Sequence, residues 1–509
     1  MSWSRRPPAA AAAALAACLA AWAAAVTTPR DFPAGTFVDD AHYAVLAQSL
    51  RERRTYRTIS LPDRPAETKY PPVWPATLAL AWNSGVGGEA NLQRLRLVNL
   101  ALAGPLAAAL ALAGIALGLS APVAAAGAAA GVLAPRFAGF WTLPLSEPLC
   151  LLFLALGVLA WARGRHGAAL AAFVLATWTR TVAAPFVLAA AFLECRADRR
   201  RGLRQATLAA LGLAPWAVWS FAHRADVPGP LLGFYGSYGA WLGEAVREDA
   251  VAALLLAPLR NALTILRSLG ESPGWWGWVP AWLATALGVA IMAALWLARR
   301  RAPLPALGVL GYAVFVLWWP FPGDRFVAAL WPLALLVALL GVPERARAAA
   351  VAAVLVLAVA GLAAGQGVRE HRVRGRSWLA MREAVASRLP AGATVAAPNP
   401  ALYYLSTGLP AVPNGKMRTY RAYRSGDLAA AWGLEDDLWA IVARYRPRFV
   451  ITGGGALNGR PAADRLYERC PGVLAAAWLR PDGAALFVTN PDAPCAPPPW
   501  RPTPSDTTP

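Results

Sequence analysis

Long apolar runs separated by short clusters of arginine are the feature that most constrains this chain. A helix of about 20 apolar residues crosses the roughly 30 Å hydrocarbon core of a bilayer. We expect eleven such helices, from the runs 9–26, 97–118, 121–141, 147–162, 166–178, 181–195, 205–222, 279–298, 303–320, 326–342 and 346–364. The sequence therefore predicts an all-α polytopic membrane protein over most of its length.

The composition agrees with a bilayer environment. Hydrophobic residues make up 57% of the 509 positions and charged residues only 15%, whereas a soluble domain carries about a quarter charged residues. The net charge of +20 comes mainly from arginines in short connections, which is how cytoplasmic loops orient a membrane protein. We interpret the charge as a topology signal and expect no nucleic-acid partner.

The arginine clusters also predict an orientation. Arg5 and Arg6 precede the first apolar run, which we interpret as a signal anchor with a cytoplasmic N-terminus. Alternating crossings then place the first long connection, 28–96, outside. The other arginine clusters that fall on the cytoplasmic side are 163–165, 196–204, 299–301 and 345–347.

Two further apolar runs, 72–86 and 251–269, contain prolines. We expect both to be interfacial or re-entrant on the outer side. If either run crosses the membrane, the orientation of the segments between it and its neighbour is reversed.

The character of the chain changes after residue 367. Within 368–490, segments 377–388 and 427–445 have helical spacing with polar faces. Short strand-like runs accompany them, at 393–397, 449–452 and 484–489. We expect 1–367 to form the membrane domain, 368–490 a small extracytoplasmic α/β domain, and 491–509 a disordered proline-rich tail.

Five cysteines occur, and no pair of them has metal-ligand spacing. Cys470 and Cys495 lie in the part of the chain predicted to be outside the membrane. An oxidising compartment permits a disulfide between them.

The most informative stretch of the outer segment begins with Asp39 and Asp40. Apolar residues at helical spacing follow the acidic pair. One interpretation is a helix cap, because aspartate stabilises the first turn of a helix by about 1 kcal/mol. A cap needs only one aspartate, however, and two adjacent carboxylates also suit a general base or a metal ligand.

Lys69 is one of only two lysines in a chain with 48 basic residues. It lies in Thr68–Pro75, where a tyrosine and a tryptophan also occur. An interfacial anchor is one interpretation, since all three residue types favour the headgroup region. Because lysine is so rare in this arginine-rich sequence, we favour the interpretation that Lys69 contacts a phosphate.

Three more ionisable residues, Glu147, Arg180 and Arg325, interrupt or adjoin apolar runs. Charges at such positions cost several kcal/mol and are functional unless they snorkel. Arg325 snorkels easily from a helix end, and we expect the neighbouring Asp324 to pair with it. In the topology derived from the arginine clusters, all these groups fall at the outer face. Together they suit acid/base chemistry on a substrate that carries phosphate.

Two other patterns are interpreted as structural. Glu435, Asp436 and Asp437 are expected on a solvated helix face rather than in a metal site. The three glycines at 453–455 follow a strand-like run but lack the rest of a dinucleotide fingerprint.

Five short motifs occur in a fixed order behind the signal anchor: Asp39-Asp40-Ala41-His42-Tyr43, Lys69-Tyr70-Pro71-Pro72, Ser146-Glu147-Pro148, Thr179-Arg180 and Asp324-Arg325-Phe326. In this order they resemble bacterial GT-C glycosyltransferases, and more narrowly the protein O-mannosyltransferase and aminoarabinose-transferase branch. The resemblance covers about residues 10–342. The C-terminal part is similar to the periplasmic domains that many of these proteins carry.

The resemblance implies a GT-C-like helical bundle in the cytoplasmic membrane. Its donor would be a polyprenyl-phosphate sugar, and its acceptor a lipid, a protein or a polysaccharide. The transfer would occur at the outer face and invert the anomeric centre. A transporter or flippase and a non-catalytic scaffold are the alternatives. We find neither the internal repeat nor the midplane charges of a transporter, and a scaffold leaves the charged motifs unexplained.

The resemblance also implies roles for individual residues. Asp39 would activate the acceptor hydroxyl, with Asp40 as the alternative. Glu147 would orient the site or hold a divalent metal together with Asp39. The residues implied in substrate binding are Lys69 at the lipid phosphate, Arg180 and Arg325 as further phosphate partners, and Tyr43 and Tyr70 from the same motifs.

Overall fold

A helix accounts for each of the eleven apolar runs, in the order that the sequence predicts. A computed structural model of the chain describes residues 7–274, 279–319, 323–386, 388–390, 392–416, 418–425, 434–452, 460–479 and 485–495. The helices of the runs are α1 (Pro7–Thr27), α4 (Gly88–Ala116), α5 (Ala121–Leu133), α7 (Glu147–Ala162), α8 (His166–Thr179), α9 (Ala184–Ala197), α10 (Arg199–Ala222), α14 (Ala281–Ala298), α15 (Pro303–Leu317), α16 (Asp324–Gly341) and α17 (Glu344–Ala363).

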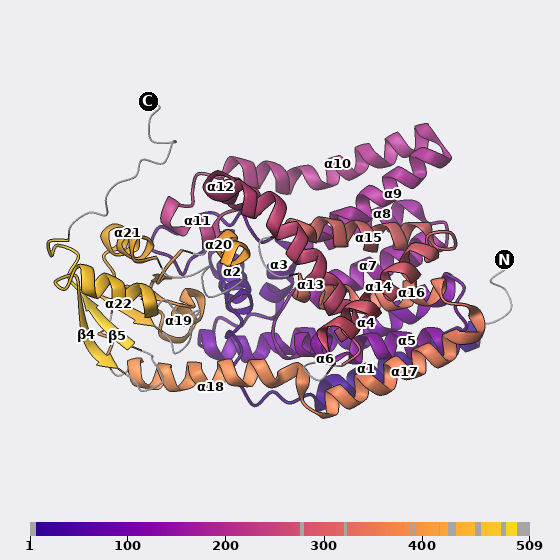
Figure 1. Cartoon of the computed structure of the whole chain (residues 1–509), viewed down its shortest axis with the longest axis horizontal. Helices are drawn as coiled ribbons and strands as arrows, with labels where there is room; N and C mark the ends of the chain where they lie inside the picture. The colour runs from indigo at the N-terminus through magenta and orange to yellow at the C-terminus, as the bar shows by residue number, and fades with distance from the viewer. Residues whose placement is uncertain are drawn as a thin grey trace.

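These helices form a bundle that occupies one end of the molecule, and the C-terminal sheet lies at the other end (Figure 1). Within the described ranges, six helices are long and apolar enough to cross a membrane, and a bent pair adds a seventh candidate. The protein is a multi-pass membrane protein. The central helix is α16. Of its residues, 83% are buried, because the helix is apolar on all sides.

The apolar run 121–141 is bent rather than straight, and as a bent pair it stays a candidate for one crossing. Helix α5 ends at Leu133, and α6 (Pro135–Ala138) continues after a bend of 63°. Pro135 causes the break, because its ring clashes with the preceding turn and it has no backbone N–H to donate. The bend turns the chain toward the loop that presents Ser146 and Glu147.

The two proline-containing runs form short or oblique helices. Helix α3 (Val73–Ala81) has nine residues, too few to cross a bilayer. Helices α12 (Tyr238–Val251) and α13 (Ala257–Glu271) are joined by a π-helical turn, and together they are long enough to cross. An interfacial position for 251–269 stays a prediction.

Both helices of the α12–α13 pair nevertheless contact residues at the end of the molecule where the bundle meets the C-terminal domain. Glu248 of α12 pairs with Arg418 of the C-terminal domain (2.5 Å). In α13, Asn261 donates to the carbonyl of Trp319 just beyond α15 (2.8 Å), and Glu271 pairs with Arg136 of α6 (3.3 Å). The pair therefore lies across the end of the bundle that faces the C-terminal domain.

The arginine clusters of the connections gather at the opposite end of the bundle. Arg301 and Arg347 both donate to the carbonyl of Leu340 (2.9 and 3.5 Å), at the far end of α16 from Arg325. His166 and Glu194, at the neighbouring turns of α8 and α9, also pair there. The predicted cytoplasmic clusters that the structure describes thus share one end of the molecule, whereas Arg5 and Arg6 lie outside the described residues.

The C-terminal domain begins with α18 (Gln366–Ala386), which runs along the bundle and leads away from α17 (Figure 1). Five strands follow: β1 (Val395–Ala397), β2 (Ala411–Pro413), β3 (Phe449–Thr452), β4 (Leu474–Leu479) and β5 (Ala485–Thr489). Their order in the sheet is β2-β1-β3-β5-β4. Strand β1 is parallel to both neighbours, whereas β5 is antiparallel to β3 and β4.

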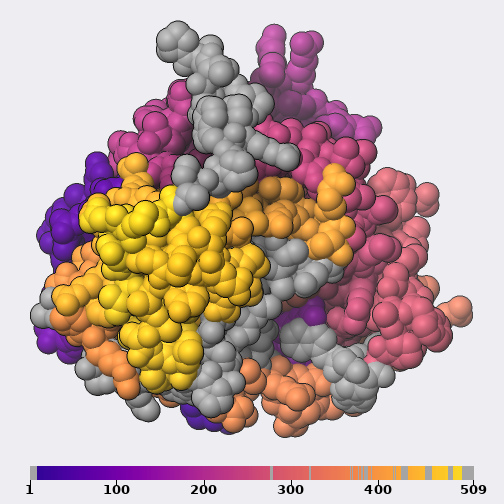
Figure 2. Space-filling view, turned by 60° about the vertical axis from the view of Figure 1, so that its left-hand side comes forward, coloured from indigo at the N-terminus to yellow at the C-terminus, as the bar shows by residue number. Residues whose placement is uncertain are grey.

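Helices α19 (Pro400–Thr407), α20 (Thr419–Ser425), α21 (Glu435–Tyr445) and α22 (Arg460–Arg469) complete this domain. Its yellow and orange residues lie in front of the bundle in Figure 2. The predicted strands at 393–397, 449–452 and 484–489 are confirmed as β1, β3 and β5 to within two residues, and β2 and β4 were not predicted. The glycines at 453–455 lie outside the described residues.

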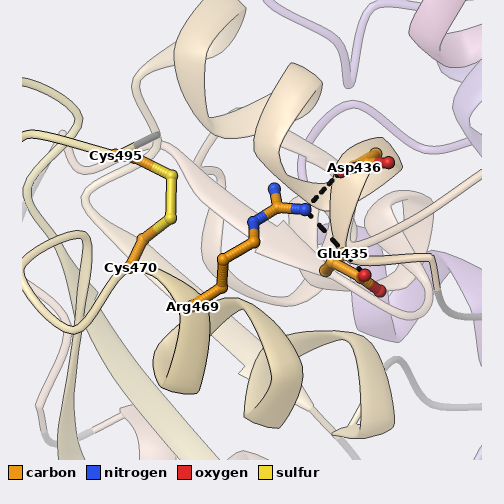
Figure 3. The surroundings of a disulfide bond; sticks show 5 residues. All are labelled: Glu435, Asp436, Arg469, Cys470 and Cys495. Atoms are coloured by element: carbon orange, nitrogen blue, oxygen red, sulfur yellow. Dashed lines mark hydrogen bonds and ion pairs between the residues drawn. A yellow bond between two sulfur atoms is a disulfide. The ribbon is translucent and has the colours of Figure 1, made fainter. Parts of the chain in front are cut away.

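A disulfide joins Cys470 to Cys495, as the sequence permits (Figure 3). Cys495 lies beyond the predicted boundary at 490. The acidic residues expected on a solvated helix face are partly exposed and ion-paired: Arg469 contacts Asp436 at 2.6 Å and Glu435 at 3.9 Å (Figure 3). Asp437 is buried and pairs with Arg418 (2.7 Å).

Candidate active site

Asp39 is the first residue of α2 (Asp39–Arg53), in the outer segment after α1. Its Oδ1 accepts a hydrogen bond from the hydroxyl of Tyr70 (2.5 Å), and its Oδ2 pairs with Nη1 of Arg325 (2.5 Å). Burial raises the pKa of Asp39, but the charges of Arg325 and Lys69 together with these hydrogen bonds outweigh it and lower the pKa to about 2. Asp39 is therefore an ionised carboxylate at neutral pH.

Asp40 lies in a different environment, although it is the next residue. Its side chain is fully buried and accepts hydrogen bonds from the backbone N–H groups of Gly35 (2.7 Å), Phe37 (3.1 Å) and Ala41 (3.0 Å). Burial raises its pKa to about 6, even though these hydrogen bonds act in the opposite direction. The carboxylate of Asp40 binds backbone and does not join the cluster around Asp39.

Glu147, the first residue of α7, forms the second half of the site. Its buried carboxylate binds Nε and Nη2 of Arg325 (2.7 and 2.6 Å) and Nη1 of Arg180 (3.0 Å). Arg180 also donates to the hydroxyl of Ser146 (2.9 Å), which hydrogen-bonds the hydroxyl of Tyr43 (3.0 Å). Two guanidinium groups therefore neutralise the two carboxylates of the site.

Lys69 completes the cluster from the segment that precedes α3. Its ammonium group donates to the backbone carbonyl of Phe234 (3.0 Å) and lies 5.2 Å from the ring centre of Tyr70 and 5.9 Å from that of Tyr238. Burial lowers its pKa, while the charge of Asp39 acts in the opposite direction. In the described part of the chain, Lys69 has no carboxylate within 4 Å, so its charge is free to meet an anion.

The structure brings together the predicted site residues from five separate parts of the sequence. Six of the eight lie in one hydrogen-bonded or ion-paired network, and Lys69 adjoins it; the network members are Asp39, Tyr43, Tyr70, Glu147, Arg180 and Arg325. Asp40 is the exception. Arg180 and Arg325, predicted as phosphate partners, are occupied by carboxylates here.

The predicted pairing of Asp324 with Arg325 is wrong. Arg325 instead binds Asp39 and Glu147, while Oδ2 of Asp324 lies 3.9 Å from Nη1 of Arg136. The physical reason is helical geometry: adjacent residues of a helix point in directions about 100° apart, so the two side chains face different neighbours.

Sequence reasoning did not single out Glu67, which shapes the Lys69 segment. Its buried carboxylate accepts hydrogen bonds from the backbone N–H groups of Lys69 (2.7 Å) and Tyr70 (3.0 Å) and contacts Nε2 of His42 (2.6 Å). Glu67 thus fixes Lys69 and Tyr70 relative to α2. The acidic residue two positions before the lysine was the available signal.

Sequence reasoning also missed the groups that hold the loop before Glu147. Asn99, in the apolar interior of α4, donates through Nδ2 to the carbonyls of Phe140, Leu143 and Leu145 (3.1, 2.5 and 2.9 Å). Arg96, one turn earlier, donates to the carbonyl of Thr142 (2.5 Å). A polar residue inside a predicted crossing was the signal, because such residues are expensive unless they have a partner.

No protein-family model matches the sequence, and no curated protein matches it. Several solved structures share its fold. The crystal structure of ArnT from Cupriavidus metallidurans bound to undecaprenyl phosphate matches with a TM-score of 0.51 at 15% identity, over 94% of this chain and 97% of that one. The chain has the GT-C fold.

Two archaeal structures extend the likeness. The oligosaccharyltransferase AglB from Archaeoglobus fulgidus, in complex with an inhibitory peptide and a dolichol-phosphate, matches with a TM-score of 0.52 at 13% identity, over 97% of this chain and 75% of that one. An Archaeoglobus fulgidus oligosaccharyltransferase in complex with Zn and sulfate gives a TM-score of 0.50 at 14% identity, over 94% of this chain and 73% of that one. These likenesses establish the GT-C fold.

The metal predicted for Asp39 and Glu147 is the one part of the GT-C expectation that the geometry does not fit. The guanidinium group of Arg325 lies between the two carboxylates and donates to both. A bridging cation would meet that positive charge at contact distance. Across the residues that the structure describes, no three His, Cys, Asp or Glu side chains are grouped closely enough to hold an ion.

Proposed function

We propose that this protein transfers a sugar from a polyprenyl-phosphate donor to an acceptor hydroxyl at the outer face of the cytoplasmic membrane. The observation that carries the proposal is the Tyr70–Asp39–Arg325–Glu147–Arg180 network, whose members contact one another over 2.5–3.0 Å. It joins an ionised carboxylate, which suits removal of the acceptor proton, to two guanidinium groups, which suit a phosphate leaving group.

The proposed reaction is a single inverting displacement. The acceptor oxygen attacks the anomeric carbon on the side opposite the phosphate. As this bond forms, the bond from the anomeric carbon to the phosphate oxygen breaks, and its electron pair stays on the polyprenyl phosphate. The acceptor proton passes to Asp39, and no covalent intermediate with the enzyme forms.

The ion pair with Arg325 bears on the strength of the base. With a pKa of about 2, Asp39 accepts a proton poorly while Arg325 is bound to it. A donor phosphate competes for Arg325, because guanidinium binds phosphate with two parallel hydrogen bonds. The negative charge of a phosphate at Arg325 offsets the guanidinium charge beside Asp39 and raises the pKa of Asp39. Donor binding thereby strengthens the base.

Apolar residues that suit a prenyl chain adjoin this network. An apolar cavity between α13, α14, α15 and α16 shares Tyr312 and Leu330 with a smaller one that is lined by Glu147 and Arg180. The apolar walls beside Arg180 suit the isoprenoid end of a donor whose phosphate meets that arginine. The polyprenyl phosphates bound in the ArnT and AglB structures support this assignment of the donor class.

The outer location rests on the arginine clusters. Arg301 and Arg347 lie at the end of α16 opposite the site, and clusters of this kind favour the cytoplasmic side. The site and the C-terminal domain then face outward. The disulfide between Cys470 and Cys495 supports that orientation, because disulfides persist in oxidising compartments.

Sugar transfer by the purified protein in lipid nanodiscs tests the proposal, with a panel of radiolabelled polyprenyl-phosphate sugars as donors. Asp39→Asn removes the base and is expected to lower kcat at least 100-fold. Asp31→Asn is the matched control, since Asp31 is an exposed carboxylate that pairs with Arg372 (2.8 Å) outside the network. Lys69→Met is expected to raise the KM of the donor about tenfold.

The proposal fails if Asp39→Asn keeps the turnover of the wild type. It also fails if the wild-type protein transfers none of the sugars while it remains folded in the nanodiscs. Equal losses in Asp39→Asn and Asp31→Asn would show that the effect of the first variant is not specific to the site.

A further inference from the structure

The backbone immediately before Asp39 is strained. Val38 has φ 78° and ψ −61°, a γ-turn conformation that is rare for any residue other than glycine and unfavourable for a β-branched one. Such a conformation costs of order 1–3 kcal/mol and persists only where the surroundings impose it. The neighbours of residues 35–38 therefore have to hold this turn in place.

One restraint comes from Asp40. Its buried carboxylate accepts the N–H of Gly35 at Oδ2 (2.7 Å) and the N–H of Phe37 at Oδ1 (3.1 Å). These two hydrogen bonds close the loop on both sides of residue 36. The side chain of Asp40 thus ties the start of α2 to the strained turn that precedes it.

The second restraint comes from the C-terminal domain. Asn399, at the N-cap of α19, donates through Nδ2 to the carbonyl of Gly35 (2.7 Å). The same domain closes tightly over this residue: a Cβ at Gly35 would lie 2.6 Å from Cδ1 of Leu402. Gly35 also has φ 94°, which a side chain would disfavour. Gly35 is therefore clamped between Asp40 and Asn399.

We propose that Asp40 and Asn399 are positioning residues for the general base Asp39, so that the C-terminal domain takes part in catalysis without touching the substrate. The inference rests on the proposed function. Asp39 has a short side chain, so a shift of its backbone moves the carboxylate by a similar amount. If the carboxylate is misplaced by about 1 Å, turnover is expected to fall about 100-fold.

Asn399 offers a substitution that separates positioning from folding. Its Oδ1 caps α19 by accepting the N–H of Leu402 (3.2 Å). Asn399→Asp keeps a good cap but cannot donate to the carbonyl of Gly35. Tyr403→Phe, in the same helix, is the matched control, because the buried Tyr403 hydroxyl has no hydrogen-bond partner among the described residues.

The experiment measures kcat, the donor KM and Tm for Asn399→Asp, Asp40→Asn and Tyr403→Phe in nanodiscs. We expect Asn399→Asp and Asp40→Asn to lower kcat at least tenfold with the donor KM within twofold of wild type. Tyr403→Phe is expected to match wild type. If Asn399→Asp does not yield folded protein, Asn399→Ser takes its place, since serine also caps a helix but is too short to reach Gly35.

A double-mutant cycle distinguishes positioning from a general structural effect. If Asn399 acts through Asp39, Asn399→Asp has no further effect on the residual kcat of Asp39→Asn. An unchanged kcat in Asn399→Asp, or an equal fold-loss in the wild-type and Asp39→Asn backgrounds, overturns the inference. These outcomes differ from failure of the proposed function, in which Asp39→Asn itself keeps wild-type turnover.

Discussion

Asp39 and Asp40 have the same side chain, yet their surroundings shift their pKa values in opposite directions. Asp40 is fully buried and Asp39 is partly buried, and burial raises both values. Asp39 faces Arg325 and Lys69, which lower its pKa to about 2. The hydrogen-bond donors to Asp40 are backbone N–H groups, and the charge of Asp39 adds to the effect of burial, so its pKa rises to about 6. Environment rather than residue type separates the two carboxylates, and the proposal assigns the reactive role to Asp39 alone.

This difference predicts a pH dependence. When Asp40 takes up a proton below about pH 6, it loses an acceptor for the N–H of Gly35, and the turn before Asp39 loosens. We expect kcat to fall as the pH drops from 7 to 5. Tm should not fall for this reason, because a raised pKa lets the folded state bind a proton that the unfolded chain does not bind above about pH 4.

The measurement is kcat and Tm of the wild type and of Asp40→Asn between pH 5 and 8. The variant has a lower kcat throughout and lacks the step near pH 6. The charged groups that face Asp40 are Asp39, which titrates near pH 2, and Arg96. A step of the same size in Asp40→Asn would assign the transition to another group.

The position of Arg325 predicts that transfer needs no divalent metal. The guanidinium group already donates to Asp39 and Glu147, which are the two carboxylates that a metal would need. We expect kcat to change less than twofold after treatment with excess EDTA and removal of the chelator. A loss of activity that Mg²⁺, Mn²⁺ or Zn²⁺ restores would contradict this arrangement.

At the scale of elements, α4 fixes the loop that leads into α7. Asn99 binds three carbonyls of residues 140–145, and Trp74 of α3 donates to a fourth, that of Pro144 (3.0 Å). These bonds satisfy backbone groups of a buried irregular segment, which membrane proteins tolerate only where protein partners replace water. The loop in turn sets the position of Glu147 at the start of α7.

Asn99→Leu tests this role. The substitution keeps a similar volume but leaves three buried carbonyls without this donor, at a cost of about 1–3 kcal/mol for each unsatisfied group. We expect a lower Tm and a lower kcat together. Asn83→Leu is a control on the neighbouring surface, because Asn83 contacts Asn91 and Gly85 outside the loop. Wild-type values in Asn99→Leu would show that the loop holds its position by packing alone.

At the scale of the whole molecule, the C-terminal domain packs against the bundle next to the candidate site. Ion pairs of Lys416, Arg418 and Arg424 with α12 hold that helix against the domain. Asn399 reaches the turn before Asp39 from the same domain. A part that the sequence presents as separate therefore contacts the turn that leads into the candidate site.

The orientation of the whole chain is testable by cysteine labelling in intact cells. In a background with Cys18, Cys150 and Cys195 replaced by alanine, Pro62→Cys places a thiol in an exposed position near the site, and Arg300→Cys places one at the opposite end. A membrane-impermeant maleimide is expected to label Pro62→Cys in intact spheroplasts and Arg300→Cys only after lysis. The reverse pattern would put the site on the cytoplasmic side.

The sequence by itself determined the membrane character and the order of the helices, and it pointed to residues that the fold brings together around Asp39 and Glu147. Apolar periodicity and arginine clusters depend on solvent and topology, which act on each segment separately. The strands β2 and β4 and the partners of Asp324 and Arg325, by contrast, depend on contacts between segments far apart in the chain. The same holds for the separate roles of Asp39 and Asp40. Only the tertiary structure places Arg325 beside Asp39 and the backbone N–H of Gly35 beside Asp40. These partners matter because the pKa of a group is set by what surrounds it in space.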